Sequence, residues 1–240
     1  MDSNGPALEV GSPAPGTYTE QGDTGDMPAT AQLTTGYGAL NQIVGSLSVG
    51  DADLYQIQIC DAANFSATTV GGAYFDTRLF LFDSAGNGVT FNDEEPGATS
   101  QSVLSPVFLS SEGTYYLAVC AAGKTPVDQG NLQLWQDEPA VAERRPDGPA
   151  AAHAIARWSG WPQGGFYRVF LTGTCFARTP CGSDFNQDGD NATDQDINDF
   201  FACLQGQCCQ ACLSADIDQD GDVGTDADIM AFFRAFAGGC

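Results

Sequence analysis

The stretch DFNQDGDNATDQDINDFFACL, residues 184–204, returns as DIDQDGDVGTDADIMAFFRAF at residues 216–236, and the two copies match at 11 of 21 positions. Each copy has Asp or Asn at its first, third and fifth positions and Gly at its sixth. Side-chain oxygens at this spacing surround a hard cation such as Ca²⁺, and the Gly permits the sharp turn that points them inward. The repeat therefore predicts two calcium loops, each followed by a helix.

The predicted ligands are oxygen donors at equivalent positions of the two loops, with a backbone carbonyl at the seventh position. They are Asp184, Asn186, Asp188 and Asp190 in the first loop, and Asp216, Asp218, Asp220 and Asp222 in the second. The turn glycines are Gly189 and Gly221. The expected bidentate Glu at the twelfth position is absent, because Gln195 and Ala227 stand there.

An aspartate one residue later is predicted to close each loop. Thr193 and Thr225 have the side chains of helix N-caps, so Asp196 and Asp228, three residues on, lie where a first-turn carboxylate faces back to the loop. Each loop is then one residue longer than an EF-hand loop. An alternative pair of closing ligands stands two residues earlier, at Asp194 and Asp226.

Apolar residues follow each loop at the spacing i, i+3, i+4, i+7, which marks one face of a helix. They are Ile197, Phe200, Phe201 and Leu204 in the first copy, and Ile229, Phe232, Phe233 and Phe236 in the second. We expect the two faces to pack against each other.

Two loop-helix units in tandem, with Asp closing each loop and one helix per loop, resemble dockerin domains over residues 184–240. The resemblance implies a calcium-folded interaction module. In cellulosome-type systems such modules dock onto a β-sandwich partner called cohesin, so the expected partner is a protein with a β-sandwich domain.

The middle of the chain alternates between short β-like runs and turns, which is typical of a β-sandwich or jelly roll. The runs cover residues 54–60, 77–83, 103–109, 114–120, 132–135 and 166–172. The sequence thus predicts a mainly β protein that ends in a small α-helical domain. The expected parts are a flexible arm (1–31), a sandwich (32–176) with a long loop at about 137–163, a linker (177–183) and the calcium-binding domain (184–240).

The segments DADLYQIQI (51–59), FDTRLFLFDSAGNGVTFNDEE (75–95) and SEGTYYLAV (111–119) resemble bacterial pre-peptidase C-terminal domains. These are secreted β-sandwiches that accompany or target an active protein, or adhere to surfaces, and are not catalysts themselves. Such a sandwich followed by a dockerin-like tail is similar to secreted proteins of planctomycete-type bacteria.

Acidic residues near the predicted strand ends raise the possibility of a third calcium site in the sandwich. The candidates are Asp51, Asp53, Asp76, Asp83, Asn92 and Asp93. The alternative is that they cap turns, which favour Asp and Asn for purely local reasons.

Nine cysteines, seven of them from Cys175 onward, indicate an oxidising compartment, and hence a secreted or cell-surface protein. Cys60 and Cys120 both end predicted strands and are expected to pair. Cys209 and Cys212 form a CxxC that we interpret as disulfide-forming, because no second CxxC or nearby His supports a zinc or redox site. The odd total leaves one thiol unpaired or bonded to another chain.

The charge balance excludes some classes of partner. There are 31 acidic residues against 8 basic ones, and from residue 182 onward 12 Asp face only Arg234. Nucleic-acid binding needs a basic surface, so we expect none. No apolar run reaches the length of a membrane span.

Catalysis has little support in the sequence. The one histidine, His153, lies in the Ala-rich stretch AAAHAIARW, and no nucleophile elbow, HExxH or phosphate loop is present.

We expect a secreted, non-catalytic assembly protein whose partner is another β-domain, including head-to-tail assembly of identical chains into a filament or surface layer. The alternative is a polysaccharide-targeting accessory module that stacks sugars on aromatic side chains. Its candidate platform is Trp135, Trp158, Trp161 and Tyr167.

Overall fold

The computed structural model describes residues 16–36, 38–95, 100–177, 183–186, 188, 190, 192–209, 212–217 and 222–238. Residues 1–15 of the expected arm lie outside this set, as do the predicted ligands Asp218 and Asp220 and both turn glycines, Gly189 and Gly221. Within the described residues the chain is mainly β, with two helices near its C-terminal end, as the sequence predicts.

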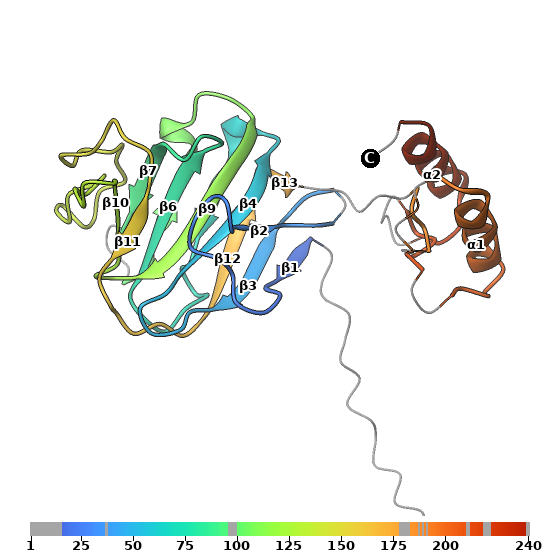
Figure 1. The fold of residues 1–240 in the computed structure, drawn as a ribbon, viewed down its shortest axis with the longest axis horizontal. Coiled ribbons are helices and arrows are strands. Elements are labelled where there is room, and N and C mark those ends of the chain that lie inside the picture. Colours follow the sequence, from blue (N-terminus) through green and yellow to red (C-terminus); the bar gives the residue numbers. More distant parts are fainter. Residues whose placement is uncertain are drawn as a thin grey trace, which may run out of the picture.

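Two mixed sheets pack on each other to form a sandwich (Figure 1). One sheet has the order β1 (Thr17–Thr19), β3 (Gln42–Ser46), β12 (Phe166–Thr172), β5 (Ser66–Thr68), β8 (Val103–Leu104). The other has the order β13 (Thr174–Phe176), β4 (Ala52–Ile59), β9 (Gly113–Ala121), β6 (Thr77–Asp83), β7 (Gly88–Asn92), with β2 (Gln32–Leu33) beside β4. A separate two-stranded sheet pairs β10 (Thr125–Val127) antiparallel with β11 (Arg157–Ser159).

The main core lies between the two sheets and follows from alternation along the strands. Successive side chains of a strand point to opposite faces. In β12, Tyr167, Val169 and Leu171 are buried in this core, while Phe166 and Phe170 face outward. The inner faces of β4, β6 and β9 supply the opposing half of the core.

The six-stranded sheet is also covered on its outer face. Phe80, Phe82 and Phe91 from this sheet pack with Leu134 and Trp135 in a second buried cluster. Ala150 and Ile155 belong to the same cluster, so part of the segment expected to be a surface loop at 137–163 covers the sheet instead. The expected strand at 132–135 is wrong, because Gln133 forms only an isolated bridge to Val127 and the buried Leu134 and Trp135 lie in a bend.

Most of the predicted strands are confirmed, and two departures have simple causes. The runs at 54–60, 77–83, 114–120 and 166–172 become β4, β6, β9 and β12. The run at 103–109 ends as a strand at Leu104, because Pro106 starts a 3₁₀ turn over Pro106–Phe108. Residues 17–19 were expected in the arm, but they form β1 through parallel pairing with β3.

The expected disulfide between Cys60 and Cys120 is wrong. Strands β4 and β9 are antiparallel, so Ile59 at the end of β4 lies opposite Gly113, while Cys120 lies opposite Ala52 at the far end of the pair. Cys60 bonds instead to Cys175, whose strand β13 pairs with the end of β4. Cys120 is a buried free thiol.

Replacing the Cys60–Cys175 pair by serine is expected to lower the free energy of unfolding of the sandwich by about 2–4 kcal/mol. The bond joins residues 115 positions apart, so its loss frees a long loop in the unfolded chain. Urea unfolding followed by Trp fluorescence measures this, because all three Trp residues lie between 135 and 161.

The control is Cys209→Ser with Cys212→Ser, whose bond spans three positions. It should leave the Trp-reported transition unchanged. Equal effects of the two replacements would show that the length of the closed loop does not determine the loss in free energy of unfolding.

The C-terminal helices are α1 (Asp194–Leu204) and α2 (Asp226–Gly238). Phe200 and Phe232 are fully buried and stack with their ring centroids 4.1 Å apart, and Phe185 packs edge-on against both. The expected packing of the two helix faces is thus confirmed at its centre. Phe201 and Phe233, on the same predicted faces, remain 39% and 41% exposed.

Two disulfides lie in this part of the chain, Cys203–Cys208 and Cys209–Cys212. The second confirms the disulfide interpretation of the CxxC. Neither described helix has the length and hydropathy needed to cross a membrane.

Candidate metal centres

The two loop-helix units begin with the same hydrogen bonds. The Asp196 carboxylate accepts from the Thr193 N–H at 2.8 Å and from the Thr193 hydroxyl at 2.7 Å. The Asp228 carboxylate accepts from the Thr225 N–H at 2.8 Å and from the Thr225 hydroxyl at 3.0 Å. The predicted N-caps are confirmed, since each Thr hydroxyl also accepts from the N–H of its Asp.

The same two carboxylates join the start of each loop to the start of its helix. Asp196 accepts from the Phe185 N–H at 2.8 Å, and Asp228 accepts from the Ile217 N–H at 2.7 Å. Both carboxylates are fully buried. Burial opposes ionisation of Asp196, but the hydrogen bonds from Thr193 and from the loop N–H groups outweigh it and lower its pKa.

The other predicted ligands lie at different depths. Asp184, Asn186 and Asp216 are half-buried, whereas Asp188, Asp190, Asp194, Asp222 and Asp226 are exposed. The Asn186 amide donates to Asp188 at 3.0 Å and to Asp199 at 3.1 Å, and the Asp190 N–H donates to Asp188 at 2.9 Å. All of these groups offer the hard oxygen donors that calcium prefers.

One group of three carboxylates is drawn together elsewhere in the described residues. Oxygens of Glu20, Asp23 and Asp53 all lie within 4.8 Å of one another, and this group could hold a metal ion. Among the described residues, no comparable cluster forms from the carboxylates of the two loops. Glu20 directly follows β1, Asp23 lies in the next turn, and Asp53 is on β4.

Asp53 is placed by a hydrogen-bonded chain that crosses the sandwich. Its Oδ2 accepts from the Tyr167 hydroxyl at 2.5 Å, and that hydroxyl is 2.6 Å from the hydroxyl of Tyr55. Gly45 makes room for this chain, because a Cβ there would clash with both tyrosine hydroxyls. Asp53 is fully buried, and its Oδ1 has no hydrogen-bond partner in the described structure.

The surroundings of Asp53 favour a bound cation. The pKa of its carboxyl is raised to about 8, mainly by burial and also by the negative charges of Glu20, Asp51 and Asp23, which together outweigh the lowering effect of the Tyr167 hydrogen bond. A buried carboxylate with one unsatisfied oxygen, beside other carboxylates, is costly when charged. A hard divalent cation would remove that cost, so the donor set fits calcium.

Only Asp53 of the six candidates for a third site belongs to this group. Asp51 accepts the Ser48 and Ala52 N–H groups, and Asp83 accepts the Ala85 and Asn87 N–H groups, so both cap turns. Asn92 accepts the Val103 N–H, and Asp93 forms an ion pair with Arg78 at 2.8 Å. Asp76 has its pKa raised to about 6, mainly by burial.

Glu20 and Asp23 were missed because the whole segment before residue 32 was assigned to the arm. The available signal was two acidic residues three positions apart, upstream of the Asp-Ala-Asp of residues 51–53. Their meeting with Asp53 depends on the pairing of β1 with β3, which the sequence does not reveal.

His153 lies in an open cavity of about 370 Å³ and has its Nδ1 2.6 Å from Oδ2 of Asp128. The Asp128 carboxylate also accepts the Gly130 and Leu132 N–H groups, so it holds the turn together. The remaining lining residues are Gln129, Ala154, Ile155 and Ala156, and none of them is a nucleophile.

The expected aromatic platform is largely dispersed. Trp135 and Tyr167 are buried, and Trp158 packs edge-on against Phe80 and Phe82. Trp161 alone of the four stays open, with 79% of its surface exposed.

No family model matches this chain, and the search of curated proteins also found no match.

Proposed function

We propose that this protein is a secreted, non-catalytic, calcium-binding assembly protein. In this proposal, the dockerin-like module at 184–240 joins the chain to a β-sandwich, either of another protein or of a second copy. The observation that carries the proposal is the matched start of the two units, in which Asp196 and Asp228 make the same bonds to loop and cap. Two equivalent loops of this kind suit two equivalent cations.

Calcium would act by holding the loop oxygens against their mutual repulsion. In the first unit the donors are the side chains of Asp184, Asn186 and Asp188 and the carbonyl of Asp190, closed by Asp194 or Asp196; the second unit uses the equivalent residues. The Glu20, Asp23 and Asp53 group would add a third site within the sandwich. Extracellular calcium and an oxidising environment agree with the three disulfides among the described cysteines.

Sedimentation velocity of the oxidised protein across a calcium titration tests the proposal. We expect large regular assemblies in calcium that dissolve when a chelator is added. A contact between the tail of one chain and the sandwich of the next is heterologous, so it propagates unless it closes into a ring. A protein that stays monomeric at high concentration with saturating calcium, and captures no β-sandwich partner, would refute the proposal.

The second candidate function is targeting to polysaccharide, and the exposure of Trp161 is the observation that favours it. Its ring lies over Gly50, near the Lys124 ammonium at 5.9 Å. Binding on a glycan array that is lost with Trp161→Ala and retained with Trp158→Ala, in a protein that does not self-associate, would favour this candidate.

A further inference from the structure

The two outer faces of the sandwich differ in how they are covered. The outer face of the six-stranded sheet is buried under the chain's own residues, including Trp135, Ala150 and Ile155. Among the described residues, none covers the outer face of the five-stranded sheet in this way, since Phe166 is 82% exposed and Phe170 is 38% exposed. Tyr74, which follows the turn at Gly71–Gly72, is fully exposed beside them.

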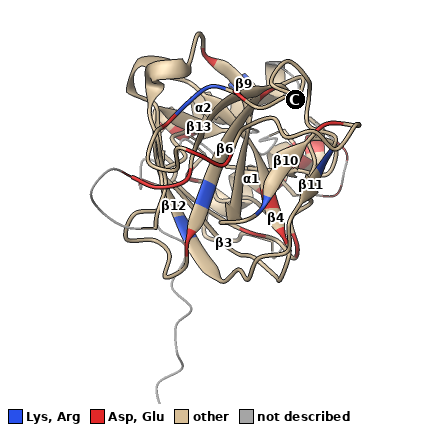
Figure 2. Cartoon of the chain, turned by 90° about the vertical axis from the view of Figure 1, so that its left-hand side faces the viewer, with Lys and Arg blue, Asp and Glu red and all other residues tan. Residues whose placement is uncertain are grey.

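This uncovered face also lacks the charge that marks the rest of the molecule. The chain has 31 acidic residues against 8 basic ones, and Figure 2 marks the Asp and Glu residues in red and the Lys and Arg residues in blue. None of the five described strands of this sheet contains Asp or Glu, and Arg168 on β12 is their only charged residue. The strands of this face thus present aromatic side chains among uncharged polar ones and no acidic residue, and this suits an acidic partner.

Arg168 is free to meet such a partner. Its side chain is exposed, and no hydrogen bond or ion pair engages its guanidinium within the described residues. Other basic residues are already used internally: Arg78 pairs with Asp93, Arg144 pairs with Asp147, and the Lys124 ammonium donates to the Gly50 carbonyl.

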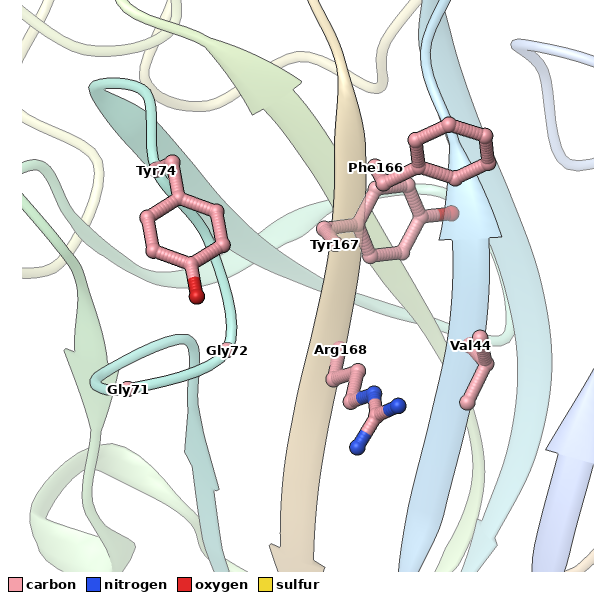
Figure 3. A pocket seen from close by; sticks show the side chains of 7 residues that line it. All are labelled: Val44, Gly71, Gly72, Tyr74, Phe166, Tyr167 and Arg168. Carbon is pink, nitrogen blue, oxygen red and sulfur yellow. The ribbon is translucent and has the colours of Figure 1, made fainter.

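A cavity of about 400 Å³ lies at the centre of this face. Figure 3 shows the Tyr74 ring on one side of β12 and the Phe166 ring on the other, with Arg168 directed toward Val44 on β3. The lining offers aromatic and aliphatic surface, and one guanidinium. Such a hollow accommodates an apolar side chain from a partner, with a carboxylate nearby.

The helical module has the complementary properties. From residue 182 onward it carries 12 Asp and one Arg. Phe201 and Phe233, at equivalent positions of α1 and α2, are partly exposed with their ring centroids 6.4 Å apart, and Met230 is exposed on α2. The two exposed aromatic rings can pack against the aromatic lining of the hollow, and the acidic residues of the module can pair with the Arg168 guanidinium.

We propose that the outer face of the five-stranded sheet, centred on Tyr74, Phe166 and Arg168, is the docking surface for the helical module of a second copy of this chain. Phe201 and Phe233 enter or cover the hollow, and Arg168 meets carboxylates of the module. The chain enters its own module from β13, which belongs to the opposite sheet, and this favours docking onto a neighbour. The inference rests on the proposed function, because it names the partner and the surface for that assembly.

Two complementary variants test the inference. The sheet variant carries Tyr74→Ser, Phe166→Ser and Arg168→Glu, and the helix variant carries Phe201→Ser and Phe233→Ser. Each change lies at an exposed position, so both variants should keep the fold and the calcium response of the separate parts. Each alone should lose self-association in calcium by at least ~30-fold in Kd, as expected for central interface residues.

A mixture of the two variants should form a one-to-one dimer and nothing larger, because each chain keeps one intact surface. Val107→Ser removes another exposed apolar side chain, one that is not part of the proposed surface, and should assemble like the wild type. Assembly of the sheet variant alone, or a mixture that stays monomeric while the wild type assembles, overturns this inference and leaves the proposed function standing. A wild type that stays monomeric in calcium overturns this inference, and it overturns the proposed function as well only when the protein also captures no β-sandwich partner.

Discussion

Removal of calcium is expected to unfold the helical module while the sandwich stays folded. Among its described residues, the module has a small core of six buried ones, Phe185, Phe200, Cys203, Ala215, Ile217 and Phe232. Against this core, 12 Asp repel one another with Arg234 as the only basic residue. A domain of this size rarely folds on its core alone, so bound cations would supply the missing stability.

The expected size of the effect follows from ligand linkage. A site filled at a calcium concentration 1,000 times its Kd contributes about 4 kcal/mol to the folded state. Two such sites exceed the stability that a core of this size provides. Hydrogen exchange measured in calcium and in chelator distinguishes the parts: amides of α1 and α2 should lose their protection in chelator, while those of β4, β6 and β9 should keep it.

A single substitution makes the result specific. Asp188→Asn removes one charged donor from the first loop and should weaken calcium binding there by at least ~10-fold, while the second loop serves as an internal reference. Asp199→Asn removes the same charge from α1 outside the predicted ligand set, and its amide oxygen can still accept the hydrogen bond from Asn186, so it is the matched control. Equal exchange of α1 and α2 with and without calcium would show that the loops do not depend on the cation.

The sequence predicts local features well wherever the chain itself carries the pattern. Short β-like runs between turn signals located β6 and β12 to the residue, although β12 alternates between buried and exposed side chains whereas β6 is buried on both faces. The loop repeat located both N-caps, since a Thr followed three residues later by Asp makes its bonds within one helical turn. These features need no knowledge of the tertiary fold.

Features that depend on pairing between strands far apart in the chain could not be predicted from the sequence. The Cys60–Cys175 bond requires β13 to lie beside β4, and both cysteines end or interrupt short runs with no local signal. Glu20 meets Asp53 only because β1 pairs with β3, next to Tyr167 of β12. Similarly, Phe201 and Phe233 matched the helical period yet remain exposed, because the core between α1 and α2 is filled by Phe200 and Phe232.

Asp53→Asn is expected to stabilise the sandwich in chelator at high pH and to destabilise it relative to the wild type in calcium. Burial raises the pKa of Asp53 to about 8 in the folded protein, against an ordinary value of 3.8. The unfolded chain therefore releases this proton near pH 4, whereas the folded chain holds it until about pH 8. Folded-state stability falls across that window, by on the order of 5 kcal/mol, and the full cost is present above pH 8.

The Asn variant removes this cost because it carries no charge, and its amide oxygen can still accept the bond from Tyr167. In chelator, the wild type and the variant should thus have similar stability at pH 4 and diverge up to pH 9, with the variant the more stable. Urea unfolding followed by Trp fluorescence measures the difference at each pH. Asp83→Asn is the control, since Asp83 caps a turn, lies outside the carboxylate group and is not among the charges that raise the pKa of Asp53.

Calcium should reverse the order of the two proteins at high pH. A cation held by Glu20, Asp23 and Asp53 favours the ionised carboxylate, so the wild type gains stability on binding and the variant gains much less. Because binding displaces the proton of Asp53, the calcium affinity of the wild-type sandwich should also rise between pH 5 and pH 8. Parallel pH profiles for the two proteins in chelator, or equal gains from calcium, would mean that Asp53 neither titrates late nor binds the ion. If no cation bound here, the cost of burying the charged Asp53 carboxylate would make the Asn variant the more stable protein in calcium as well as in chelator. A wild type that is the more stable protein in calcium therefore identifies a cation bound at this group.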